Sequence, residues 1–171
     1  MPTSSTFPGG ALVASDVAFL LVPAILGLGP SAFTALTSKK TKTARIPCGR
    51  RSTLTPPPWV FAVGWTVLYV LVGIAGMLAW RRTGRRLDRR PIPTFAILVA
   101  SLVFWWLTFS NICAPRLAFA SILALLLVAA STAGLFAIEG ERLGAALLCP
   151  LVAWLVFASY LSFVTTFSLP L

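Results

Sequence analysis

The sequence predicts an all-α polytopic membrane protein built as a bundle of five transmembrane helices. Hydrophobic residues make up 58 % of its 171 residues and charged residues only 11 %, whereas about a quarter of an ordinary soluble domain is charged. All 18 charged residues lie outside five uncharged stretches, each of which is 22 residues or longer. Because about 18 apolar residues are enough for a helix to cross a bilayer, each stretch is long enough to be a span.

The predicted helices form a single membrane domain over residues 1–171. Their approximate ranges are 17–36, 58–80, 92–113, 117–138 and 143–168. The first contains Pro23 and Pro30, which a membrane helix tolerates when its neighbours satisfy the freed backbone groups, so we expect it to be packed and kinked. The second follows three consecutive prolines, which favour an extended backbone and then a helix start.

Two connections, 37–55 and 81–90, carry six basic residues each. The arginines of 81–90 recur every four residues, so a helical extension would keep them on one face. We expect this charge to meet lipid phosphates, and a docking surface for anionic lipid or an acidic partner is the alternative. Each end of the bundle holds seven basic residues, so the positive-inside rule does not orient the chain.

Composition excludes several classes of protein. The chain has no histidine, which removes histidine-based catalytic triads, histidine-ligated haem and the usual zinc sites. No ionisable residue lies inside a predicted span, apart from Asp16 at the edge of the first, which argues against a pump or an ion-coupled carrier. The net charge of +10 resides in the connections rather than on one folded face, so no nucleic-acid partner is expected.

Two motifs carry a family resemblance. Residues 56–69, PPPWVFAVGWTVLY, followed by Gly73 and Trp80, are similar to the second-helix motif of the translocator protein family (TspO/MBR, also called the peripheral benzodiazepine receptor family). Residues 149–161, CPLVAWLVFASYL, resemble the fifth-helix pattern of that family. Five spans, a long first connection and a short chain also suit the family.

The chain departs from the family pattern at several positions. The stretch 104–109 keeps its tryptophans but lacks the asparagine and proline common on the third helix, and Ser121 stands where the family has an acidic residue. Ser162 takes the place of a frequent asparagine on the fifth helix. Nothing basic follows Tyr160, so the vertebrate sterol-recognition pattern is absent, and that route to sterol binding is not expected.

Two stripes of side chains at helical spacing indicate a ligand cleft between the second and fifth helices. They consist of Ala62, Trp65, Tyr69, Gly73 and Gly76, and of Pro150, Trp154, Ala158, Leu161 and Thr165. Small residues beside large rings can leave a cleft in which a flat apolar ligand such as a tetrapyrrole stacks on tryptophan while Tyr69 donates a hydrogen bond. The alternative is that the stripes only pack helix on helix.

The resemblance implies a pocket for porphyrins and drugs, and it extends the set of candidate residues. The predicted ligand-binding residues are Phe61, Ala62, Trp65, Tyr69, Trp105, Ala120, Trp154, Phe157, Ala158 and Leu161, with Arg50, Arg51 and Trp59 as contacts from the first connection. No cofactor or metal is required, and protoporphyrin IX or haem is the expected ligand. In bacterial relatives the matching tryptophans are implicated in light-dependent porphyrin breakdown, so any catalysis would be photochemical at Trp65 and Trp154.

Two smaller patterns each allow two interpretations. Cys149-Pro150 sometimes marks thiolate ligation of haem iron, although a cysteine in a helix is more often a small apolar filler. Ala96 and Ala100 form a small-xxx-small pair that can seat a homodimer.

The sequence therefore predicts a receptor-like membrane protein that binds hydrophobic ligands, chiefly porphyrin and secondarily sterol or benzodiazepine-type drugs, in tetrapyrrole handling or stress regulation. A transporter of sterol or porphyrin is one alternative, and a scaffold that recruits partners through the basic connections is another. The expected partners are the bilayer, a small hydrophobic ligand and a second copy. The resemblance implies the mitochondrial outer membrane in a eukaryote and a cell-envelope membrane in a bacterium.

Overall fold

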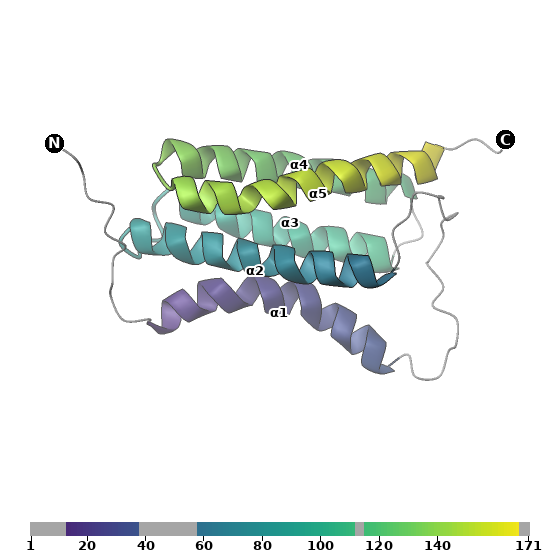
Figure 1. The fold of residues 1–171 in the computed structure, drawn as a ribbon, viewed down its shortest axis with the longest axis horizontal. Coiled ribbons are helices and arrows are strands. Elements are labelled where there is room, and N and C mark those ends of the chain that lie inside the picture. The colour runs from purple at the N-terminus through teal and green to yellow at the C-terminus, as the bar shows by residue number, and fades with distance from the viewer. Residues whose placement is uncertain (1–12, 38–57, 112–114, 168–171) are drawn as a thin grey trace.

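The structure, a computed structural model, describes residues 13–37, 58–111 and 115–167. These residues form five α-helices: α1 (Ala14–Thr37), α2 (Pro58–Arg82), α3 (Pro91–Asn111), α4 (Pro115–Ile138) and α5 (Arg142–Phe167). Four of them are long and apolar enough to cross a membrane by length and composition, and α1 contributes a shorter apolar stretch, Ala14–Leu26, among the residues searched. Figure 1 shows one bundle of side-by-side helices. The all-α, five-helix membrane fold is confirmed.

The order of the helices around the bundle differs from their order along the chain. The most extensive contacts join α4 to α5, α1 to α2, α3 to α4 and α2 to α5, while α3 also touches α1 and α2. The last helix therefore lies between α2 and α4, and α1 lies on the far side of α2 (Figure 1). This order brings α2, α3 and α5 around a shared interior.

Proline sets the start of three helices. Pro58, Pro91 and Pro115 are the first residues of α2, α3 and α4, where the missing N–H costs no helical hydrogen bond. The predicted starts at 92 and 117 are therefore one and two residues late. Figure 1 also shows α1 bending midway, so that its second half diverges from α2, in agreement with the expected kink.

The predicted arginine stripe on a helical extension of α2 does not form. The helix ends at Arg82, and Gly84 and Arg85 follow with φ angles of 66° and 60°. Positive φ at successive residues ends a right-handed helix, and for a residue with a side chain it is uncommon. The turn sends the arginines of 81–90 in different directions instead of along one face.

Asp16 on α1 binds two arginines at the end of α2 and in the turn that follows, and so holds α1 against α2. Its side chain is 0 % exposed and accepts hydrogen bonds from Nε of Arg81 at 3.1 Å and from Nε and Nη2 of Arg85 at 3.2 and 3.0 Å. The backbone N–H of Val13 donates a further bond at 3.2 Å. Hydrogen bonds from Arg85, with those from Val13 and Arg81, hold the pKa of the Asp16 carboxyl well below its usual range despite its burial.

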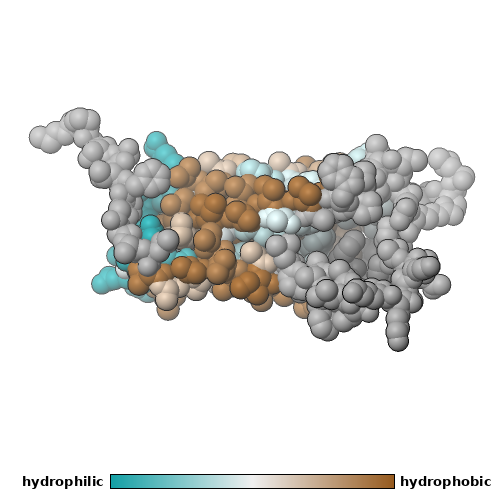
Figure 2. Space-filling model, turned by 60° about the horizontal axis from the view of Figure 1, so that its bottom comes forward, coloured by the Kyte–Doolittle hydropathy of each residue, from teal (hydrophilic) through white to brown (hydrophobic). Residues whose placement is uncertain are grey.

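Close approach of backbones holds the apolar part of the bundle together. A Cβ placed on Gly73 of α2 would collide with the carbonyl oxygen of Leu20 on α1, and one on Gly76 would meet the ring of Phe95 on α3. Between α3 and α4, the hydroxyls of Thr108 and Ser121 lie 3.1 Å apart and share a hydrogen bond. On the face shown in Figure 2, apolar side chains cover much of the described surface, as expected of a surface that faces lipid.

Replacing Gly73 by alanine should separate α1 from α2. Because the obstacle is backbone rather than a flexible side chain, we expect the free energy of unfolding to fall by about 1–3 kcal/mol, the usual cost of overpacking. Unfolding of the purified protein by SDS in mixed micelles measures this change. Gly134→Ala on α4, where a Cβ meets nothing within 4 Å, is the matched control and should leave stability unchanged or slightly raised. Equal behaviour of the two variants would contradict the close approach.

The Asp16 contact predicts a dependence of stability on pH. With its folded pKa lowered from 3.8, this carboxylate contributes stability above about pH 4, where the unfolded chain is also ionised, and loses it as the pH falls further. We expect Asp16→Asn to lower the thermal midpoint at pH 7, and we expect the gap to wild type to narrow without closing at pH 3, where the folded carboxyl is still ionised. Asp88→Asn, which changes an exposed carboxylate in the same turn region, should have little effect at either pH. A midpoint of Asp16→Asn equal to wild type at pH 7 would refute the assignment.

Candidate functional site

Three tryptophans from three helices meet inside the bundle. The ring of Trp65 on α2 stacks on that of Trp105 on α3, with centroids 5.0 Å apart and planes 27° apart. Trp154 on α5 meets Trp65 at 6.2 Å and nearly at a right angle, 81°. Trp105 is buried and the other two are half-buried. We call these three residues the tryptophan cluster.

Two further rings extend the cluster. Tyr69, one turn after Trp65 on α2, is buried, and its ring lies 5.6 Å from that of Trp65. Phe157 on α5 lies 5.9 Å from Trp154 and is exposed at the surface of the bundle. Aromatic pairs at such separations are attractive beyond the area that they bury. The rings therefore form a continuous aromatic surface from the interior to the lipid-facing side.

Gly64 makes room for the indole of Trp154. A Cβ at Gly64 would lie 3.2 Å from Cη2 of that ring and 3.4 Å from Cζ3, closer than side chains normally approach one another. The indole of Trp154 therefore lies over the backbone of α2 at Gly64, the residue before Trp65. Sequence reasoning did not single out Gly64, and its position one residue before Trp65 was the available signal.

The structure brings together five of the ten residues proposed to bind ligand. These are Trp65, Tyr69, Trp105, Trp154 and Phe157. Ala158 and Leu161 are buried on α5, and Ala120 is exposed on α4. Arg50 and Arg51 lie outside the described residues, as do the side chains of Trp59, Phe61 and Ala62, although α2 includes their backbone.

The predicted stripe along α2 does not line one continuous cleft toward α5. Gly73 and Gly76, which the helical spacing places with Trp65, are in contact with α1 and α3. Helical spacing identifies residues that share a face, but a face of about 100° can touch two neighbouring helices at once. The ring contacts with α5 are accordingly made by Trp65, near the start of the helix.

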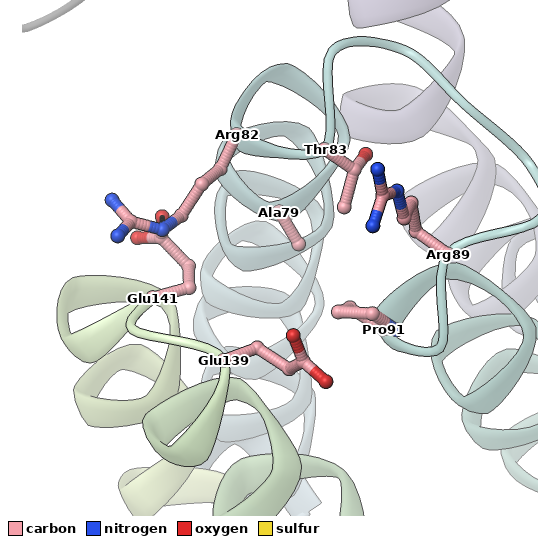
Figure 3. Close-up of a pocket in the computed structure, with 7 residues that line it drawn as sticks. All are labelled: Ala79, Arg82, Thr83, Arg89, Pro91, Glu139 and Glu141. Atoms are coloured by element: carbon pink, nitrogen blue, oxygen red, sulfur yellow. Dashed lines mark ion pairs between the residues drawn. The ribbon is translucent and has the colours of Figure 1, made fainter.

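Two hollows in the described part of the protein lie away from the tryptophan cluster. One, of about 420 Å³, is an apolar groove between α1 and α3. The other, of about 200 Å³, is polar and lies where the end of α2, the start of α3 and the α4–α5 turn meet. Figure 3 shows Arg89 and Glu139 approaching this second hollow from opposite sides, with Arg82 directed at Glu141, whose Oε2 lies 4.0 Å from the arginine Nε.

The chemistry available at the tryptophan cluster is that of an apolar surface with one hydroxyl. Within the described residues no group of three His, Cys, Asp or Glu side chains is placed to hold a metal ion. Cys149 is exposed on α5, and its Sγ lies 3.5 Å from the carbonyl oxygen of Ala145. The arrangement suits stacking and apolar contact rather than acid–base or nucleophilic chemistry.

Long apolar helices surrounding an internal group of tryptophans define a multi-pass helical membrane protein with an aromatic interior. Residues 19–167 match the TspO/MBR family. The chain is also 32 % identical over 147 residues to the tryptophan-rich protein TspO of Archaeoglobus fulgidus, an alignment that covers 86 % of this chain and 92 % of that relative. The chain belongs to the TspO/MBR family, which confirms the resemblance drawn from its second- and fifth-helix motifs.

Replacing Gly64 by valine should displace the indole of Trp154. The added side chain would occupy the space of Cη2 and Cζ3, so Trp154 must turn away from α2 and its contact with Trp65 is lost. We expect a shift in the tryptophan emission maximum and a reduced near-ultraviolet circular dichroism signal. Gly134→Val on α4, where space is open, is the matched control. Identical spectra for Gly64→Val and wild type would contradict this packing.

Proposed function

We propose that this protein binds a flat hydrophobic ligand, a porphyrin or related tetrapyrrole, at the tryptophan cluster. The observation that carries the proposal is the meeting of three indoles from α2, α3 and α5. A right-angled contact between two rings leaves ring face uncovered, and the face of an indole is a stacking surface for a planar aromatic ligand. Family membership supports the same ligand class.

The position of the cluster suits a ligand that has both an apolar ring and carboxylates. Trp65 lies seven residues after Pro58, the first residue of α2, which places it about 10 Å along the helix. The connection before α2 carries six basic residues. A porphyrin ring stacked on Trp65 would lie near the start of α2, and we propose Arg50 and Arg51 of the preceding connection as partners of its propionates because the arginine fork matches a carboxylate.

The proposed action is sequestration within the bilayer. The ligand would insert beside the Trp65–Trp105 stack and turn Trp154 from its edge contact toward a parallel one. Trp154 is half-buried and Phe157 is exposed. A ligand that enters beside α5 therefore has to displace few buried side chains, and we propose this side as the route of entry. Tyr69 supplies the hydroxyl that donates a hydrogen bond to a polar edge of the ligand.

Titration with protoporphyrin IX tests the proposal. We expect saturable quenching of tryptophan fluorescence in the purified protein, measured in the dark. Trp65→Phe and Trp154→Phe should each weaken the apparent affinity about 3- to 10-fold, the range expected for losing one good aromatic contact. Trp106→Phe, which changes the neighbouring half-buried tryptophan on α3, is the matched control and should retain affinity.

Each variant has one tryptophan fewer, which by itself changes the fluorescence signal. Porphyrin absorbance, measured in the same titration, reports binding without depending on tryptophan emission. A porphyrin band that shifts and saturates equally for wild type, Trp65→Phe and Trp154→Phe would place the ligand elsewhere and reject the assignment. Illumination of the saturated complex forms a second arm, because loss of the porphyrin band that requires either tryptophan would add photochemistry to binding.

A further inference from the structure

The apolar groove between α1 and α3 lies at the opposite end of the bundle from the start of α2. Its walls come from the first half of α1 and from the first three turns of α3, including Ala96 and Ala100. At its mouth lies Leu87, which belongs to the turn between α2 and α3 and is 68 % exposed. The volume of about 420 Å³ falls within the range of sites that hold small apolar ligands, roughly 300–1,000 Å³.

The six arginines of the same turn region differ in their surroundings. Arg81 and Arg85 bind Asp16, Arg82 faces Glu141, and Arg89 lines the polar hollow (Figure 3). Arg86 and Arg90 are exposed, and no described carboxylate lies within ion-pair distance of either. Arg86 directly precedes Leu87, and Arg90 stands two residues before Ile92; both Leu87 and Ile92 line the groove.

From these two features we infer that the α1–α3 groove binds one anionic phospholipid. An acyl chain lies along the apolar walls, and the phosphate is held by Arg86 and Arg90. Arginine suits this role because its fork can donate two hydrogen bonds to one phosphate. The exposed Leu87 between the two arginines contacts the chain just below the headgroup, where an apolar residue would otherwise face water.

Charge distinguishes a lipid from a second copy of this chain as the occupant. A two-fold symmetric dimer through this groove would bring the same surface of both subunits together. Arg86 and Arg90 of both subunits, which adjoin groove residues in the sequence, would then gather beside one interface, and like charges across an interface are unfavourable. An anionic lipid neutralises both arginines and fills the groove at the same time.

Native mass spectrometry of the full-length protein in detergent tests this inference with two probes, dioleoyl phosphatidylglycerol and dioleoyl phosphatidylcholine. The two lipids share acyl chains and differ in net charge. We expect the first phosphatidylglycerol to bind about 25-fold more tightly, since one basic residue near an anionic lipid contributes on the order of 5-fold. Glycerol 3-phosphate, which lacks chains, should not displace it.

Two variants separate the headgroup from the chain. The double variant Arg86→Gln with Arg90→Gln should bring the two lipids to within about 2-fold of each other. Ala96→Leu with Ala100→Leu, which fills the groove, should weaken binding of both lipids. Arg142→Gln is the matched control, because Arg142 is exposed at the same end of the bundle, at the start of α5, and it should preserve the preference.

Three results would overturn the inference. One is equal affinity of wild type for the two lipids. Another is an equal loss of preference in Arg142→Gln and in the Arg86/Arg90 variant, which would mean a general attraction to basic charge. The third is a dimer that Ala96→Leu with Ala100→Leu dissociates while lipid affinity is unchanged, which would assign the groove to a second copy. Porphyrin titration of each variant is independent, because the tryptophan cluster shares no residue with the groove.

Discussion

The structure depends on close contact between helices. The lipid around them is as apolar as their side chains, so the hydrophobic effect does not drive those side chains into the interior. In lipid, burying a leucine between helices gains little, so van der Waals packing and a few polar contacts must hold the bundle together. The collision that prevents a side chain at Gly73 and the hydrogen bond between Thr108 and Ser121 are contacts of this kind. The helices therefore approach one another where side chains are small, and the indole of Trp154 packs where Gly64 leaves room.

The arginines of the turn at the α2–α3 end of the bundle are alike in sequence but differ in their contacts. All four acidic residues lie at this end, beside seven of the 14 basic ones. Beside the left-handed residues Gly84 and Arg85, two arginines bind Asp16, whereas no carboxylate in the described part of the chain pairs with Arg86 or Arg90. Buried pairing fixes α1 in place, whereas unpaired charge at the headgroup level attracts phosphate.

The fold was predictable from the sequence because long uncharged runs permit few structures in a bilayer. That Trp65 and Trp154 face the same region between α2 and α5 was also predictable, since both stand in motifs that the family shares, but their direct ring contact was not. The Asp16 contact was not, because it requires both that α1 lie beside α2 and that α2 end at Arg82, and neither follows from hydrophobic periodicity. The misplaced role of Gly73 and Gly76 has a similar cause, because spacing along one helix does not say which neighbour meets its face.

The fastening of α1 at Asp16 and its midway bend together have a mechanical consequence. A helix held rigidly at one end and interrupted by a buried proline, Pro23, bends most easily at the interruption, where a backbone hydrogen bond is missing. Its first half is held against α2, so any difference in the direction of its second half is expected to arise at this interruption.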